Sequence, residues 1–347
     1  MKIGFVINDI ETEPHNYTTP NLALTAHKMG HEVFLVGVGD LAYTSQGHMR
    51  AHAHKPKDKG YKSSSSFMKD IKASERVSIS SKDLDILFLR NNPADDIGTR
   101  DWAQNAAYIF GQIAINDHTI VVNHPESLSN AINKMYFQHF PEILRPKTII
   151  TRDQKEIEDF YQSNGNRMIL KPLQGSGGTN VFFVDKDSAH NMAQIIEAIS
   201  RDGYIIAQEY LPAAKEGDIR LFLMNGEPLC VDGKYAAIKR VNKSGEVRSN
   251  ISAGGQPAKV EVNESMLDMA EVLRPKLVQD GMFLVGIDVV GDKLMEINVF
   301  SPGGLNMMST AYETDFLTPV INALERKLRY QKIYGGGTLD NIRLGSL

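Results

Sequence analysis

Residues 283–305, FLVGIDVVGDKLMEINVFSPGGL, constrain the fold more than any other stretch of the chain. Two short apolar runs flank a Gly-Asp pair at 291–292, which is the pattern of a β-hairpin. Three oxygen-bearing side chains interrupt the apolar runs: Asp288, Glu296 and Asn298. A carboxylate inside a strand costs free energy unless a positive group meets it. The hairpin therefore needs cationic partners, either a metal ion or arginine and lysine side chains.

The register of this hairpin decides whether the three side chains can share one ion. Glu296 and Asn298 are two residues apart, so they point to the same face of their strand. Asp288 joins them only if residue numbers paired across the ladder sum to an even value. A plain two-residue turn pairs 290 with 293, an odd sum, so a metal site requires a connection of odd length, such as the three residues 291–293, or an equivalent β-bulge within the strands. Such a set of oxygens would suit Mg2+.

Composition describes an ordinary globular protein. The 347 residues are enough for two or three lobes, and the net charge of -4 lacks the basicity of nucleic-acid-binding proteins. No apolar run approaches the roughly 18 residues of a membrane span. The single cysteine, Cys230, excludes an internal disulfide and is typical of a reducing compartment. We therefore expect a cytoplasmic protein with no nucleic-acid or membrane partner, and with Cys230 buried.

The first part of the chain has the alternating pattern of an α/β lobe. Residues 3–7 and 33–36 are apolar runs typical of buried strands, with a helical pattern between them. A further apolar run, 85–89, ends in Arg90. Ligands of parallel sheets bind beyond the carboxyl ends of the strands. Arg90 is therefore a candidate contact for an anion, with a structural salt bridge as the alternative.

A second informative stretch follows a lobe boundary expected at His124-Pro125. Residues 168–184, MILKPLQGSGGTNVFFV, indicate strand, loop and strand, with Lys171 at the end of the first strand. Loop glycines allow backbone N–H groups to close on phosphate oxygens: Gly175, Gly177 and Gly178. Neither the P-loop nor the dinucleotide-binding pattern is present, so a plain glycine-rich turn is the alternative to a phosphate lid.

Between this loop and the hairpin lie a linker and several basic residues. An apolar strand at 204–207 leads into 208–212, QEYLP, which is suited to presenting backbone groups to a flat heterocycle. Residues 218–231 form the clearest predicted hairpin, with Arg220 in its first strand. Arg240, Arg248 and Asn250 follow. Their position favours phosphate and carboxylate binding over a solvated basic surface.

Taken together, the order and spacing of these motifs resemble the ATP-grasp superfamily, and within it the bacterial glutathione synthetases, over about residues 1–330. The motifs that carry the resemblance are Asn133-Lys134, Leu170-Lys171-Pro172-Leu173 with Gly175-x-Gly177-Gly178, Gln208-Glu209-Tyr210-Leu211-Pro212, Asp218-x-Arg220, Arg240, Arg248-x-Asn250, Gly254-Gly255, Gly286-x-Asp288 and Glu296-Ile297-Asn298-Val299-x-Ser301-Pro302.

The resemblance implies an α/β protein of three-lobed ATP-grasp architecture, with an N-terminal parallel-sheet domain preceding the ATP-grasp lobes. Residues 1–124 would form the substrate-side domain and 125–206 the middle lobe with the Gly-rich lid loop. Residues 207–332 would form the C-terminal lobe with the Mg2+ site. We expect 333–347, which contains three successive glycines, to be a flexible tail.

The resemblance also implies an activity. It is that of an ATP-dependent carboxylate–amine ligase acting through an acyl phosphate, most closely glutathione synthase, which joins γ-glutamylcysteine to glycine. The protein would supply positioning and charge neutralisation rather than a nucleophilic side chain. Two Mg2+ ions, with Mn2+ as a substitute, and a homo-oligomer, either dimer or tetramer, are further implications.

Residue by residue, the resemblance assigns four sets. The ATP set is Lys134, Lys171, Gly175, Gly177, Gly178, Gln208, Glu209, Tyr210 and Leu211. The metal set is Asp288, Glu296 and Asn298. The set that handles transferred phosphate and substrate carboxylate is Arg220, Arg240, Arg248 and Asn250. The substrate set is Arg90, Ser301, Pro302 and Gly303.

One segment departs from the family pattern. The usual Thr-Ser-Pro-Thr-Gly is replaced by FSPGG at 300–304, where the peptide substrate would lie. An ATP-grasp ligase with a different acid or amine is therefore one alternative. A catalytically inactive nucleotide-binding regulatory protein is an alternative of another class. The intact Asp288, Glu296, Asn298 and Arg220 argue against it, because unpaired carboxylates in strands are costly.

Overall fold

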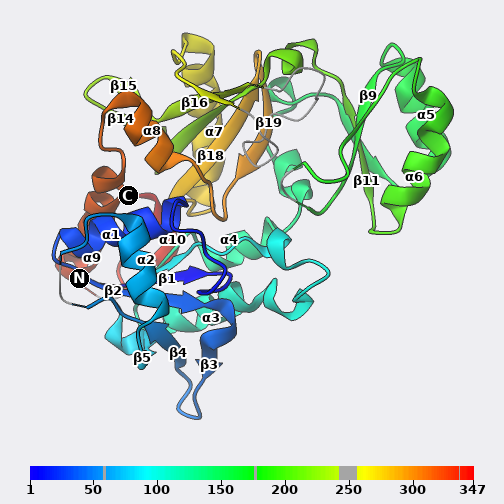
Figure 1. Ribbon diagram of the computed structural model, residues 1–347. Coiled ribbons are helices and arrows are strands. Elements are labelled where there is room, and N and C mark those ends of the chain that lie inside the picture. Colours follow the sequence, from blue (N-terminus) through cyan, green and yellow to red (C-terminus); the bar gives the residue numbers. More distant parts are fainter. Residues whose placement is uncertain (58–59, 176–177, 242–255, 336) are drawn as a thin grey trace.

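The computed structural model describes residues 1–57, 60–175, 178–241, 256–335 and 337–347 (Figure 1). Within these residues the strands form one large sheet in each of three successive parts of the chain. The middle part projects to one side of the molecule, while the N-terminal and C-terminal parts lie against each other (Figure 1). This is the α/β, three-lobed arrangement that the sequence predicts, whereas the exact lobe boundaries stay predictions.

The N-terminal sheet has a parallel core with an antiparallel extension. Parallel strands in the order β2-β1-β6-β7 are β1 (Lys2–Ile7), β2 (Glu32–Gly37), β6 (Ile86–Leu89) and β7 (Ile120–Val122). The extension on the β2 edge consists of β3 (Leu41–Tyr43), β4 (Met49–His54) and β5 (Arg76–Ser80). The sheet is therefore mixed rather than wholly parallel.

Helices cover both faces of the parallel core because its strands are apolar on both sides. In β1, Ile3 and Phe5 pack with α1 (Thr18–Lys28) and α2 (Ser64–Lys72). Val6, the residue after Phe5, belongs to the other core, which includes α3 (Ala106–Asn116). This period of two is what a twice-covered strand requires.

The middle lobe is an antiparallel sheet backed by two helices. Its strands, in the order β10-β9-β11-β8, are β8 (Thr148–Thr151), β9 (Met168–Pro172), β10 (Phe182–Val184) and β11 (Ile205–Glu209). The helices are α5 (Gln154–Ser163) and α6 (Met192–Ser200), and their apolar sides share a core with β9 and β11. The short helix α4 (Pro125–Asn130) and the 3-10 helix η5 (Lys134–His139) precede this lobe.

The C-terminal lobe carries the hairpin that organises the sequence. Its sheet, in the order β17-β16-β12-β18-β19, consists of β12 (Asp218–Met224), β16 (Ala237–Val241), β17 (Gln256–Ala258), β18 (Leu284–Val290) and β19 (Lys293–Asn298), with β13 (Glu227–Pro228) paired to β12. Its helices are α7 (Glu264–Gln279), α8 (Leu305–Tyr312) and α9 (Leu317–Tyr334).

The predicted hairpin at 218–231 is present, and its continuation corrects one expectation. Met224 pairs with Glu227 around Asn225-Gly226, both of which have positive φ angles, as a tight hairpin turn requires. Cys230 follows in β14 (Cys230–Val231), which pairs only with the short β15 (Lys234–Tyr235). Its side chain is exposed rather than buried, whereas the neighbouring Val231 packs against the core.

The C-terminal segment, expected to be a flexible tail, is docked in the structure. Helix α10 (Asn341–Ser346) reaches the edge of β7, where Asn341 accepts a hydrogen bond from the backbone N–H of Val121 and donates one to its carbonyl, both at 2.8 Å. The fully buried Lys327 donates to the carbonyl of Gly345 at 3.0 Å. The glycines at 335–337 predicted a flexible tail, but these hydrogen bonds to residues distant in the sequence could not be predicted from them.

Asn123 joins the N-terminal lobe to the C-terminal hairpin. Its Oδ1 accepts from the backbone N–H groups of Phe283 at 2.7 Å and Leu284 at 3.0 Å. Its Nδ2 donates to the carbonyl of Leu284 at 3.2 Å and to that of Val299 at 2.6 Å. One buried amide therefore holds the start of β18 and the residue just after β19.

The helices of the described residues include none that is both long enough and apolar enough to cross a bilayer.

Candidate functional site

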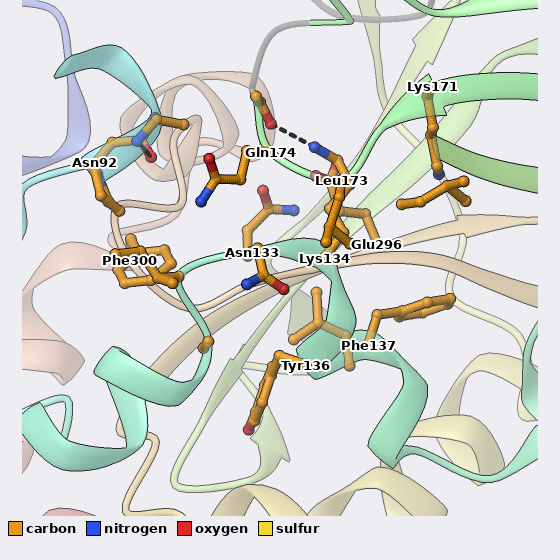
Figure 2. Close-up of a pocket in the computed structure, with 18 of the residues that line it drawn as sticks. Asn92, Asn133, Lys134, Tyr136, Phe137, Lys171, Leu173, Gln174, Glu296 and Phe300 are labelled. Carbon is orange, nitrogen blue, oxygen red and sulfur yellow. Dashed lines mark hydrogen bonds between the residues drawn. The ribbon is translucent and has the colours of Figure 1, made fainter. Parts of the chain in front are cut away.

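A pocket lies where the three lobes meet (Figure 2). The N-terminal lobe contributes Asn92, which follows β6, and η5 contributes Lys134. Lys171 comes from β9, and Glu296 and Asn298 come from β19. Residues predicted from separate motifs of the sequence thus line one cavity.

A β-bulge brings Asp288 to the predicted face of the hairpin. The two-residue turn pairs Val290 with Lys293, which alone would send Asp288 to the opposite face. The register then shifts between Asp288 and Val289, so that Asp288 pairs with Glu296. Gly286 pairs with Asn298 in the same register. The structure therefore meets the geometric requirement of the metal site through a bulge within the strands.

Asp288 is buried between two arginines. Arg220 binds it in bidentate fashion, with Nε to Oδ1 and Nη2 to Oδ2 both at 2.7 Å, and Arg240 Nη2 lies 2.7 Å from Oδ2. Arg240 also pairs with Asp218. Burial alone would raise the pKa of Asp288, but the two guanidinium groups override it and hold that pKa at about 2. Of the two kinds of cationic partner predicted for Asp288, a metal ion or basic side chains, this structure shows the basic side chains.

Glu296 faces two lysines instead. In the part of the chain that the structure describes, it has no ion-pair partner, yet its charge acts on Lys134 and Lys171. Burial lowers the pKa of both lysines, bringing that of Lys171 to about 8, and Glu296 opposes this shift. Lys171 donates to Oε1 of Gln208 at 2.9 Å, and Lys134 donates to the carbonyl of Gly175. Two ammonium groups around one carboxylate leave positive charge available for a phosphate.

The hairpin side chains are of the chemical kind that a hard divalent cation prefers, although in this structure both carboxylate oxygens of Asp288 bind arginines. Asp288 and Glu296 are directly opposed, and Nδ2 of Asn298 lies 3.3 Å from Oδ2 of Asp288, so the three side chains share one face. Carboxylate and amide oxygens are the ligands that Mg2+ accepts. Across the described residues no group of three or more His, Cys, Asp or Glu side chains is placed to hold a metal ion. A site here therefore needs the amide of Asn298 as well as the carboxylates.

The predicted adenine-side residues follow β11. Gln208 is buried, and its side chain makes two hydrogen bonds. Its Oε1 accepts from Lys171, and its Nε2 donates to Oγ1 of Thr148 at 3.0 Å, so the amide positions the lysine. Glu209 accepts from the backbone N–H of Lys147 at 3.1 Å. The ring of Tyr210 packs on Phe183 with centroids 4.4 Å apart. Contacts of Gln208, Glu209, Tyr210 and Leu211 with ATP stay predictions.

The structure describes only some of the remaining predicted residues. Gly175 and Gly178 have φ angles of 128 and 76 degrees, which favour glycine. Gly177, Arg248 and Asn250 lie outside the described residues, as do Gly254 and Gly255. Of the four predicted catalytic residues, the structure thus describes Arg220 and Arg240, and both form ion pairs with Asp288.

The predicted substrate residues meet at the junction of the N-terminal and C-terminal lobes. Arg90 is 2% exposed and donates to the carbonyl of Pro302 at 3.0 Å and to Oγ1 of Thr19 at 3.2 Å. The structural salt bridge is not found for Arg90 within the described chain, and direct contact with an anion stays a prediction. Ser301 lines the pocket, and Gly303 follows the buried Pro302.

Sequence reasoning missed Asn92, Gln174 and Asn123. Asn92 lines the pocket two residues beyond Arg90, so the rule that selected Arg90 could have found it. Gln174 lies within the Gly-rich segment and also lines the pocket. Asn123 carries no motif, and only its hydrogen bonds with Phe283 and Val299 reveal its role.

Comparisons with known proteins cover nearly the whole chain. Residues 1–129 match the prokaryotic glutathione synthetase N-terminal domain, and residues 133–313 match the ATP-grasp domain of the same family. Glutathione synthetase of Yersinia pestis is 33% identical over 339 residues, or 96% of this chain and 99% of the relative. Glutathione synthetase of Escherichia coli strain K12 is 32% identical over 335 residues, or 95% and 100%.

Solved structures with more distant sequences share the fold. The D-cycloserine synthetase DcsG aligns with a TM-score of 0.62 at 15% identity, over 93% of this chain and 99% of its own. The ATP-grasp ligase PsnB, complexed with a minimal precursor, aligns with a TM-score of 0.58 at 16% identity, over 94% and 99%. At these identities the similarity concerns the fold alone.

Proposed function

The chain belongs to the prokaryotic glutathione synthetase family of ATP-grasp ligases, and from this membership we propose that its pocket joins γ-glutamylcysteine to glycine with conversion of ATP to ADP and phosphate. The observation that carries the proposal is the bulged register of β18 and β19, which places Asp288 opposite Glu296. Lys134 approaches from η5 and Lys171 from β9 of the middle lobe, so acidic and basic groups converge where phosphate transfer requires both.

The chemistry follows from the poor leaving-group character of a carboxylate oxygen. An oxygen of the cysteinyl carboxylate attacks the γ-phosphorus of ATP, and the bond from that phosphorus to the bridging oxygen of ADP breaks. The amine of glycine then attacks the acyl carbon, the carbon–oxygen bond to phosphate breaks, and the amine loses a proton. No protein nucleophile is needed, so the side chains act by positioning and by neutralising charge.

We assign the residues accordingly. Lys134 and Lys171 hold nucleotide phosphates, and Arg220 and Arg240 act on the transferred phosphate or the substrate carboxylate. Asp288, Glu296 and Asn298 would hold Mg2+, which would neutralise charge on the phosphates. The family implies ATP and Mg2+, and two ions, replacement by Mn2+, and a homo-oligomeric state belong to the proposal.

Nucleotide affinity is expected to fall as pH rises through about 8. Burial and the neighbouring Lys134 lower the pKa of Lys171 to about 8, while Glu296 opposes the shift. Phosphate binds the protonated lysine, so the competent fraction drops above that pKa, and affinity at pH 9 should be about tenfold weaker than at pH 7. Lys134, whose pKa is also lowered, acts in the same direction.

Variants of Lys171 test this assignment by calorimetric titration with ATP. Lys171→Met should lose roughly 1–3 kcal/mol of binding free energy at pH 7, as expected for one charge-assisted contact, and should flatten the pH profile. Lys171→Arg keeps the charge and should flatten the profile with a smaller loss of affinity. Wild-type affinity in the Met variant would contradict the assignment.

The function itself is tested by ADP release. With ATP and Mg2+ present, we expect release only when γ-glutamylcysteine and glycine are both supplied, and omission of either should reduce it to background. Release with another acid or amine, and none with this pair, would favour a different ATP-grasp ligase. ATP binding without turnover of any pair would favour the regulatory alternative.

A further inference from the structure

Phe300 occupies a defined place in the pocket, away from the phosphate-binding lysines. It follows β19 and lines the cavity beside Asn92, whereas Lys171 lies on the other side (Figure 2). Its backbone is anchored on both sides, because Asn123 binds the carbonyl of Val299 at 2.6 Å and Arg90 binds that of Pro302 at 3.0 Å. The backbone on both sides of Phe300 is therefore held in place.

The ring separates the pocket from buried polar groups of the N-terminal lobe. Phe300 packs on Tyr108, with ring centroids 5.6 Å apart. Tyr108 is 1% exposed and does not line the pocket. The hydroxyl of Tyr108 and the amide of Asn91 are both buried and lie close to each other. Phe300 therefore gives this side of the pocket an apolar surface and covers the polar groups of Tyr108 and Asn91.

The chemistry of the site indicates which part of the substrate meets this wall. The reacting carboxylate must lie near the proposed metal ligands Glu296 and Asn298. Phe300 is two residues beyond Asn298, which is roughly 6–7 Å along an extended chain. The group within reach at that distance is the side chain on the carbon next to the reacting carboxylate. In γ-glutamylcysteine this is the CH2SH group, and sulfur makes favourable contacts with aromatic rings.

We propose that Phe300 is a specificity-determining residue, whose ring forms an apolar wall against the side chain adjoining the reacting carboxylate. The ring selects thiol or methyl side chains over hydroxyl side chains, because a hydroxyl there would lose its hydration without gaining a partner. This inference rests on the proposed function and extends it by assigning the selection of the acid substrate to one residue.

The test measures kcat/KM for three acids, γ-glutamylcysteine, γ-glutamyl-α-aminobutyrate and γ-glutamylserine, with glycine as the amine. The wild-type protein should use the first two with similar efficiency and the serine compound at least about tenfold less well. Phe300→Thr, which introduces the usual family residue and opens the wall toward Tyr108, should reduce this discrimination about tenfold. Phe300→Leu keeps an apolar wall and should retain it.

The outcomes separate this inference from the function on which it rests. A wild-type protein that uses γ-glutamylserine as well as γ-glutamylcysteine overturns the role of Phe300, whether or not the variants fold. Unchanged discrimination among the three acids in Phe300→Thr also overturns the role of Phe300. If Phe300→Thr instead changes the preference between glycine and alanine as the amine substrate, the role is likewise overturned, because the ring would then face the amine. A wild-type protein inactive with γ-glutamylcysteine and glycine overturns the proposed function itself.

Discussion

Asp288→Asn is expected to abolish ligase activity and to lower the free energy of unfolding by about 3–5 kcal/mol, the usual cost of breaking a buried ion pair. Asp288 is 3% exposed and accepts from both Arg220 and Arg240. Arg240 keeps Asp218 as a partner, but Arg220 would lose its charged partner. Urea denaturation gives the stability change, and ADP release gives the activity.

Glu296→Gln provides the matched control. Glu296 is directly opposite Asp288 and belongs to the same proposed metal set, yet it has no ion-pair partner in the described chain. Its substitution should reduce activity and Mg2+ affinity with a change in unfolding free energy of less than about 1 kcal/mol. Equal destabilisation by both variants would contradict the distinct electrostatic environments described for the two carboxylates.

Asn123→Ala is expected to lower the free energy of unfolding by at least about 4 kcal/mol, because each buried group left unsatisfied costs about 1–3 kcal/mol. The groups that lose this partner are the N–H groups of Phe283 and Leu284 and the carbonyls of Leu284 and Val299. Because these flank the hairpin that carries the proposed Mg2+ ligands, the concentration of Mg2+ needed for half-maximal activity should also rise about tenfold.

Asn341→Ala separates the two effects. Asn341 is likewise buried and makes two hydrogen bonds with Val121, but it docks α10 rather than the hairpin. It should destabilise the protein without changing the Mg2+ requirement. An unchanged Mg2+ requirement in Asn123→Ala would show that Asn123 contributes to stability alone.

Local sequence patterns were sufficient for much of the fold. Apolar runs such as 3–7 and 33–36 predicted the parallel strands, and Asn225-Gly226 predicted its hairpin turn, because both signals depend on neighbouring residues. The set of motifs also pointed to the family before any geometry was known. The roles assigned to Lys134, Lys171 and the hairpin oxygens stay predictions that the variants above address.

Non-local contacts decided what these patterns left open. Sequence alone established that Asp288 and Glu296 need cationic partners, since burying a bare carboxylate is costly. Which partner Asp288 has depends on β12 and β16 bringing Arg220 and Arg240 beside β18, a pairing that joins residues far apart in the chain. Likewise, whether Asp288 faces Glu296 depends on a bulge that adds one residue to the ladder and reverses the face of every side chain beyond it. The glycines near residue 335 predicted a flexible end, but Lys327 and Val121 dock it, because hydrogen-bond partners from other elements outweigh local chain flexibility.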